Sequence, residues 1–189
     1  MKMDPPPKML ASLAITILMM TMAISVALAS DAAVLEGQAR AFLIWKDSLD
    51  NQSQQTLRSW GNTSEPCNWR GITCGTGVHR HQPVIDGIFL RGMRLRGVLE
   101  SLNSSALKTL TRLDLSYNNL TGNIPPSIGV LGELQALLMQ GNQIRGSIPP
   151  GLANLTKLCF LMLHDNEVSG EIPRQIGNMS SLVTLNLSS

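Results

Sequence analysis

The strongest constraint on this chain is a 24-residue repeat that fills its C-terminal half. A leucine recurs at this interval at Leu110, Leu134, Leu158 and Leu182, and each begins the pattern Leu-x-x-Leu-x-Leu, with Met139 replacing one leucine. Three of the copies continue with an asparagine, a glycine and an apolar-Pro pair. Because several linked positions match from copy to copy, chance is a poor explanation, and we expect a stack of similar units.

The repeat also indicates the local structure of each unit. In Leu-x-Leu, alternate side chains of a strand point to one face, so the leucines enter a core while the residues between them face solvent. The asparagines that follow, Asn118, Asn142 and Asn166, can satisfy backbone groups of a buried turn and of the neighbouring unit. This is the leucine-rich-repeat signature, and it predicts an α/β solenoid of right-handed coils with a parallel concave sheet.

The repeats are expected to occupy residues 84–189. The segment containing Ile85, Ile88 and Leu90 fits the template as a degenerate first copy, in which Met93 stands at the asparagine position. Three regular copies follow, and the copy that begins at Leu182 stops before its asparagine. The sequence therefore predicts a degenerate first repeat, three regular repeats and a truncated last one.

Residues 1–29 are typical of a secretory signal peptide. Lys2 and Lys8 precede a mostly apolar, uncharged run, and Ala27-Leu28-Ala29 provides a cleavage site. Because the run is slightly long, an uncleaved anchor is the alternative. Seven Asn-x-Ser/Thr sequons support export as a glycoprotein. They begin at Asn51, Asn62, Asn103, Asn119, Asn154, Asn178 and Asn186. The expected location is secreted or on the extracellular face of the plasma membrane.

Residues 30–83 are expected to form a cap over the first repeat. Asp31 is a candidate N-cap of an amphipathic helix, and a second turn is expected over residues 53–57. Cys67 and Cys74 are expected to form a disulfide in an oxidising compartment. Zinc held together with His79 and His81 is the alternative, although six residues separate the cysteines where finger sites use about two to four.

Cys159 is the third cysteine of the chain. It follows Leu158, an inward position of the repeat, so a buried and inert thiol is expected, with an intermolecular disulfide as the alternative.

The cap and the repeats together resemble the ectodomains of plant leucine-rich-repeat receptor-like kinases. The resemblance rests on Cys-x-Trp-x-Gly-Ile-x-Cys at residues 67–74 and on Leu-x-Gly-x-Ile-Pro at residues 120–125, and it covers residues 31–189. It implies an extracellular sensor of peptides or partner receptors, which in that family is followed by a membrane helix and a kinase. The chain departs from the family in having no second hydrophobic span and no kinase motif.

Function is therefore expected to be recognition and not catalysis. The formal net charge is +2, and no nucleophile, paired-carboxylate or metal motif stands out, so no enzyme activity, cofactor or nucleic-acid partner is expected. The first hypothesis is a peptide- or protein-binding fragment of a receptor-like kinase ectodomain in cell-surface signalling, with a co-receptor ectodomain as another partner. The alternative is a secreted binding protein, such as a wall-enzyme inhibitor or a decoy receptor. Membrane attachment would need a missing C-terminal span or an uncleaved signal.

The candidate binding surface is the solvent face of the concave sheet. Aligning the copies gives columns of solvent-facing residues that lie about 4.8 Å apart between neighbouring strands. The columns are Gly87, Arg112, Ala136, Phe160, Thr184; Phe89, Asp114, Leu138, Met162, Asn186; Arg91, Ser116, Gln140, His164, Ser188; and Gly92, Tyr117, Gly141, Asp165, Ser189. The candidate ligand-binding residues are Tyr117, Leu138, Gln140, Phe160, Met162, His164 and Asp165. The alternative is that these are scattered exposed side chains, or that further coils cover them.

Overall fold

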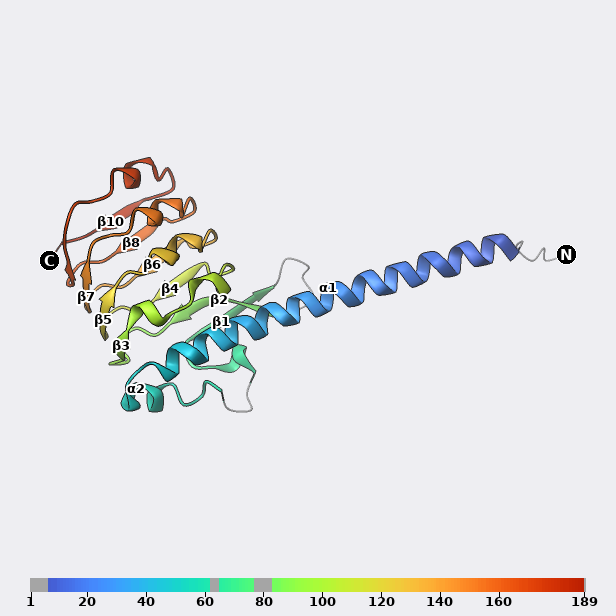
Figure 1. Ribbon diagram of the computed structural model, residues 1–189, viewed down its shortest axis with the longest axis horizontal. Helices are drawn as coiled ribbons and strands as arrows, with labels where there is room; N and C mark the ends of the chain where they lie inside the picture. The colour runs from blue at the N-terminus through green and yellow to red at the C-terminus, as the bar shows by residue number, and fades with distance from the viewer. Residues whose placement is uncertain (1–6, 62–64, 77–82, 189) are drawn as a thin grey trace.

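The computed structural model describes residues 7–61, 65–76 and 83–188. The chain begins with helix α1 (Pro7–Asp47) and the short helix α2 (Asn51–Thr56), and then enters a solenoid whose coils stack along one axis (Figure 1). The strands are β1 (Ile72–Thr76), β2 (Pro83–Phe89), β3 (Arg96–Val98), β4 (Arg112–Asp114), β5 (Asn119–Asn123), β6 (Ala136–Leu138), β7 (Gln143–Gly146), β8 (Phe160–Met162), β9 (Glu167–Val168) and β10 (Thr184–Asn186). The 3-10 helices are η1 (Pro66–Asn68), η2 (Leu99–Ser101), η3 (Ser104–Ala106), η4 (Pro126–Val130), η5 (Pro150–Asn154) and η6 (Arg174–Asn178).

The coils carry strands on two sides. The main sheet has the order β1-β2-β4-β6-β8-β10, and all its pairs are parallel except the antiparallel pair of β1 with β2. This sheet confirms the parallel sheet that the Leu-x-Leu segments predict. A second sheet, β3-β5-β7-β9, is also parallel and was not anticipated from the sequence.

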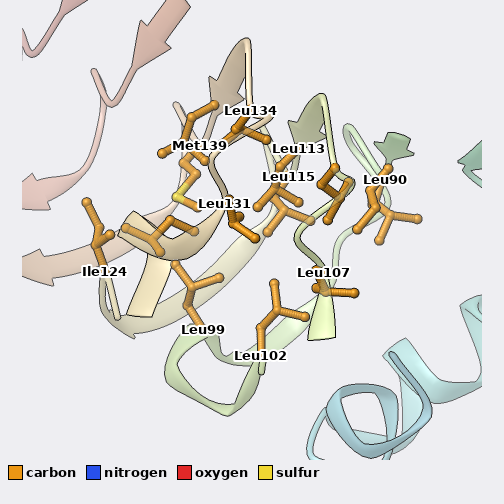
Figure 2. Close-up of a cluster of buried hydrophobic side chains, with 14 of the residues drawn as sticks. Leu90, Leu99, Leu102, Leu107, Leu113, Leu115, Ile124, Leu131, Leu134 and Met139 are labelled. Atoms are coloured by element: carbon orange, nitrogen blue, oxygen red, sulfur yellow. The ribbon is translucent and has the colours of Figure 1, made fainter. Parts of the chain in front are cut away.

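The leucine core lies inside the coils. Leu113 and Leu115 from the main-sheet side and Leu99 and Leu102 from the opposite side point into the same interior (Figure 2). Figure 2 also shows Leu131 of the same coil as Leu113, and Leu134 of the next coil, in this cluster, and all six residues are buried. Since the strands of the main sheet are short, one coil cannot bury its own leucines, and stacking creates the core.

The glycines of the repeat lie where the backbone requires them. Gly122 and Gly146 have φ values of 87° and 76°. A Cβ at Gly146 would also collide with the side chain of Asn123 in the preceding coil. Glycine is therefore favoured at this position both by its backbone conformation and by the close approach of neighbouring coils.

An aromatic cluster closes the N-terminal end of the core. The Trp60 ring stacks on Trp69 with centroids 5.7 Å apart and meets Phe42 edge-on at 5.6 Å, with Trp45 beside them. Trp60 Nε1 donates to the carbonyl oxygen of Arg70 at 2.9 Å, which satisfies the polar end of a buried side chain. The cap thus covers the first coil, as expected.

The helices of the cap begin differently from the prediction. Asp31 does not cap a helix, because α1 passes through it without a break and extends well away from the coils (Figure 1). The N-cap is instead Asp50, whose side chain accepts from Ser53 N at 2.8 Å at the start of α2. The described side chains of residues 16–20 and Met22 are exposed. Among the described parts of the chain, no helix combines the length and the hydropathy of a membrane span.

Gln38 joins α1 to the main sheet. Its side chain is fully buried, donates from Nε2 to Ile85 O at 2.8 Å and accepts at Oε1 from Ile85 N at 2.9 Å. Nε2 also donates to Thr109 Oγ1 at 2.7 Å. One glutamine therefore satisfies both backbone groups of a residue in β2.

The bonding of Cys67 and Cys74 decides between the disulfide and zinc. Cys67 and Cys74 form a disulfide, so their sulfurs are bonded to each other and the zinc alternative is wrong; His79 and His81 lie outside the described residues. Cys159 is free, but it is half-buried and not fully buried as expected, and its Sγ lies 3.5 Å from Lys157 O. It directly precedes β8, where the chain turns from the core to the surface.

Candidate ligand-binding surface

The register of the main sheet aligns the candidate residues across coils. Leu138 pairs with Met162, and Met162 pairs with Asn186, while Ala136 pairs with Phe160. These are the neighbours that the repeat alignment predicts, one strand apart. Leu138, Phe160 and Met162 therefore form one continuous surface, which we call the apolar patch.

A groove of about 310 Å³ lies over this patch. Its lining residues are Arg112, Ala136, Leu138, Gln140, Phe160, Met162 and Thr184. Phe160 is 45% exposed, a high value for an aromatic side chain on a sheet. Ala136 leaves room beside it, since it has the smallest side chain in its column apart from glycine. The groove can therefore receive an apolar side chain between β4 and β8.

Gln140, which lines the groove, and His164, at the same repeat position one coil later, each hold a buried atom without a hydrogen-bond partner in the part of the chain that the structure describes. Gln140 is only 6% exposed, which corrects the expectation that it faces solvent, and its Oε1 has no hydrogen-bond partner among the described residues. The same holds within the described ranges for Nδ1 of His164, one coil further on. Nε2 of His164 lies 3.9 Å from an Asp165 carboxylate oxygen. Buried polar atoms normally find partners, but these two are shielded from solvent, so a ligand on the surface reaches them only if their side chains reorient.

Tyr117 adopts an unusual backbone conformation beside the patch. Its φ is 55°, whereas Gly92 and Gly141 hold the same repeat position. Asp165 also has a positive φ, of 54°, so the fourth predicted column is a turn at the strand ends and not part of the strands. A Cβ at Gly141 would lie 2.7 Å from Tyr117 Cδ1, so glycine there makes room for the ring. The left-handed conformation is costly for a bulky residue and so marks a position worth testing for function.

Arginines border the surface at its cap end. The guanidinium of Arg91 lies 4.3 Å from the Tyr117 ring centroid, and that of Arg112 lies 5.4 Å from the Phe89 ring. Arg112 also lines the groove, although it is not among the candidate ligand-binding residues predicted from the sequence. The repeat alignment places Arg112 in the same column as Ala136 and Phe160, so its position within that column was the signal that could have identified it.

The repeated asparagines form a structural ladder. Asn142 donates from Nδ2 to Leu115 O at 3.0 Å and to Met139 O at 2.9 Å, and its Oδ1 accepts from Leu120 N at 3.0 Å. Asn118 and Asn166 repeat this arrangement. Each amide is occupied on both sides, so these residues are not available to a ligand.

The ladder also explains Met93. Each asparagine makes hydrogen bonds to the coil before its own. For example, Asn118 accepts from Leu95 N and donates to Leu90 O of the first coil. The first coil instead has β1 as its neighbour on that side, and β1 pairs with β2 antiparallel and not parallel like the later strands. Met93 therefore replaces none of the asparagines that make these hydrogen bonds between coils.

The sequons are distributed unevenly over the surface. Asn51 begins α2, Asn103 precedes η3, Asn119 begins β5, and Asn154 and Asn178 end η5 and η6. Asn62 lies outside the described residues. Within the described chain, Asn186 on β10 is the sequon that falls on the main sheet. No group of three or more metal-ligating side chains occurs in these described ranges.

The stacked coils, the parallel main sheet, the asparagine ladder and the disulfide-linked cap define a leucine-rich-repeat solenoid. Family descriptions agree: "Leucine rich repeat N-terminal domain" matches residues 35–75, and "Leucine Rich Repeat" matches residues 109–131 and 133–155. The LRR receptor-like serine/threonine-protein kinase RGI3 of Arabidopsis thaliana is 42% identical over 105 residues. That match covers 54% of this chain and 9% of RGI3, so the chain spans about a tenth of that relative's length.

Solved structures give the same result. The BIR2 ectodomain from Arabidopsis thaliana is 32% identical with a TM-score of 0.66, and the match covers 77% of this chain and 76% of that one. The LRR ectodomain of the Arabidopsis thaliana membrane receptor kinase GASSHO1/SCHENGEN3, in complex with CASPARIAN STRIP INTEGRITY FACTOR 2, is 30% identical with a TM-score of 0.68. That match covers 77% of this chain and 17% of that one. The chain therefore belongs to the plant leucine-rich-repeat receptor kinase family, and the matched region is the leucine-rich-repeat part.

Proposed function

We propose that this chain is an extracellular recognition module, part of a receptor-like kinase ectodomain, whose main sheet binds an extended peptide or a peptide-like segment of a partner ectodomain. The observation that carries the proposal is the groove over the apolar patch. It combines exposed Phe160 with Leu138 and Met162 on neighbouring strands, so one ligand residue would meet a continuous apolar surface.

The form of the ligand follows from the geometry of the sheet. The groove runs across strands from Arg112 on β4 to Thr184 on β10, so an elongated ligand would contact several coils at once. An extended peptide offers alternating side chains, of which every second one can face the apolar patch. A ligand that lies flat over several coils gains specificity from each of them.

Two further observations support this surface. The described sequons leave β2, β4, β6 and β8 free of N-glycan sites, so a ligand could approach most of the main sheet. The GASSHO1/SCHENGEN3 ectodomain was solved in complex with a partner, and its family relationship favours the receptor hypothesis over a secreted inhibitor or decoy. Extracellular location and cleavage after Ala29 belong to the same proposal.

The proposal can be tested by peptide selection on the secreted chain. A synthetic library of linear peptides would be selected against the immobilised protein, and selected peptides would be measured against Phe160→Ser. The matched control is Val130→Ser, since Val130 is 43% exposed on η4 and lies outside the main sheet. We expect selected peptides to carry an apolar anchor and to lose binding only to Phe160→Ser. Peptides equally sensitive to both variants, or to neither, would refute binding in the groove.

A further inference from the structure

Asn186 differs from the ladder asparagines in its hydrogen bonding. Its Oδ1 accepts from Ser188 N at 3.2 Å and from Ser188 Oγ at 2.9 Å. Its Nδ2 makes no hydrogen bond within the described chain, whereas Nδ2 of Asn142 donates to main-chain carbonyls. The nitrogen that would carry a glycan is therefore free, and the hydroxyl that the sequon requires is already beside the amide.

The position of Asn186 links this sequon to the groove. Asn186 pairs with Met162 of the apolar patch, and Thr184, two residues earlier on the same strand, lines the groove. Residues two apart on a strand share a face, and neighbouring strands lie about 4.8 Å apart. A sugar attached to Asn186 would thus stand directly beside Met162.

We propose that Asn186 is N-glycosylated and that its glycan restricts access to the groove from the β10 side. In this modification the amide nitrogen forms a bond to the anomeric carbon of a lipid-diphosphate-linked oligosaccharide. The lipid diphosphate leaves, and the amide loses one proton. The cap end of the groove, at Arg112, stays open, so the glycan selects ligands that enter from that side. The attachment is independent of the proposed function, while ligand selection rests on it.

Asn103 provides a matched control. Its Oδ1 accepts from Ser105 N at 3.1 Å and from Ser105 Oγ at 2.6 Å, which is the local geometry of Asn186 at a site away from the main sheet. An effect that comes from removing any glycosylated sequon would appear at both Asn103 and Asn186. An effect on the groove should appear only at Asn186.

The first measurement is mass spectrometry of the full chain secreted from plant cells, with and without peptide N-glycosidase. We expect a glycan on Asn186, and an unmodified Asn186 in the secreted protein would overturn the proposal.

The second measurement is access to the groove. Met162→Cys, in a Cys159→Ser background, would be labelled with a small maleimide and with a polyethylene-glycol maleimide. We expect the large reagent to react severalfold more slowly than in the Asn186→Gln variant, with no such effect of Asn103→Gln. If Asn186→Gln is not secreted, Ser188→Ala removes the same sequon. Equal rates with and without the glycan would overturn the proposal. Because no ligand is needed, this result is separate from the peptide selection.

Discussion

The first coil and the last described coil contrast in an instructive way. The first coil has the less regular sequence, with Met93 at the asparagine position, yet Ile88, Leu90 and Leu95 are fully buried. The last coil has the regular leucine pattern, yet Leu185 is 40% exposed. The difference lies in the neighbours, because the aromatic cap covers the first coil. The repeat pattern determines which way a side chain points, and the adjacent coil determines whether it is buried.

The largest expected effect separates two leucines at one repeat position. Leu113 is fully buried, so Leu113→Ala should lower the free energy of unfolding by about 2–5 kcal/mol. Leu185→Ala should cost less than half of that, because the side chain is already partly in water. Urea titrations of the two variants measure both values. Similar losses would mean that burial by the neighbouring coil does not control stability.

The cap disulfide is expected to have the next largest effect. Replacing Cys67 and Cys74 with serine should cost about 2–4 kcal/mol. The lower end is expected, since Cys74 follows Cys67 by only seven positions and the closed loop is short. The loss should be local to the cap, so tryptophan fluorescence should report it before amide hydrogen exchange in coils near β8. Equal loss of protection at both ends would contradict the contrast between them. Mass spectrometry of the secreted protein without reductant checks the disulfide and the expected cleavage after Ala29.

Loss of one ladder asparagine should be smaller. Asn142→Ala leaves the backbone groups of Leu115, Met139 and Leu120 without their partner, at a cost of about 1–3 kcal/mol. Thermal unfolding measures the loss, with the exposed Asn154→Ala as a control. A variant that melts normally but no longer binds a selected peptide would show that Asn142 is a ligand contact and not structural.

The smallest expected effect is a pH dependence at Glu100. Burial disfavours the ionised carboxylate, but the hydrogen bonds from Asn123 N and Nδ2, together with nearby Arg145, outweigh it and lower the Glu100 pKa. A lowered pKa adds stability above the unfolded-state value, and this stability is lost as pH falls through the folded value. Glu100→Gln should therefore be slightly less stable than the parent at neutral pH. This difference in stability should vanish in acid, and thermal melts across this pH range would detect the change. A difference that stays constant with pH would show that ionisation of Glu100 does not contribute to stability.

Much of this fold follows from short-range sequence patterns. Leucines at fixed intervals predict the main sheet, its columns and the asparagine ladder, because each signal repeats and each copy checks the others. The apolar patch followed in the same way, since Leu138, Phe160 and Met162 are adjacent once the copies are aligned.

Features that depend on contacts between different elements were not predictable. The second sheet has strands such as Asn119–Asn123, whose length and composition give no clear alternating pattern. Gln38 looks like a surface residue of a helix, and only its proximity to Ile85 reveals its role. The burial of Gln140 depends on neighbouring coils in the same way, so its unsatisfied oxygen could not be inferred from the sequence.

Each ladder asparagine completes the hydrogen bonds of the coil before it, so the coils are completed in order from the N-terminus to the C-terminus. A turn in one coil acquires its last hydrogen bonds only when the next asparagine is in place, as Asn166 does for Ile144 N. During synthesis at the ribosome, each coil would therefore remain incomplete until about one repeat more has emerged. The same polarity suits duplication of the gene segment, because an inserted 24-residue copy brings the amide that its predecessor needs and receives its own from its successor. Such a chain can lengthen internally without redesign of either end.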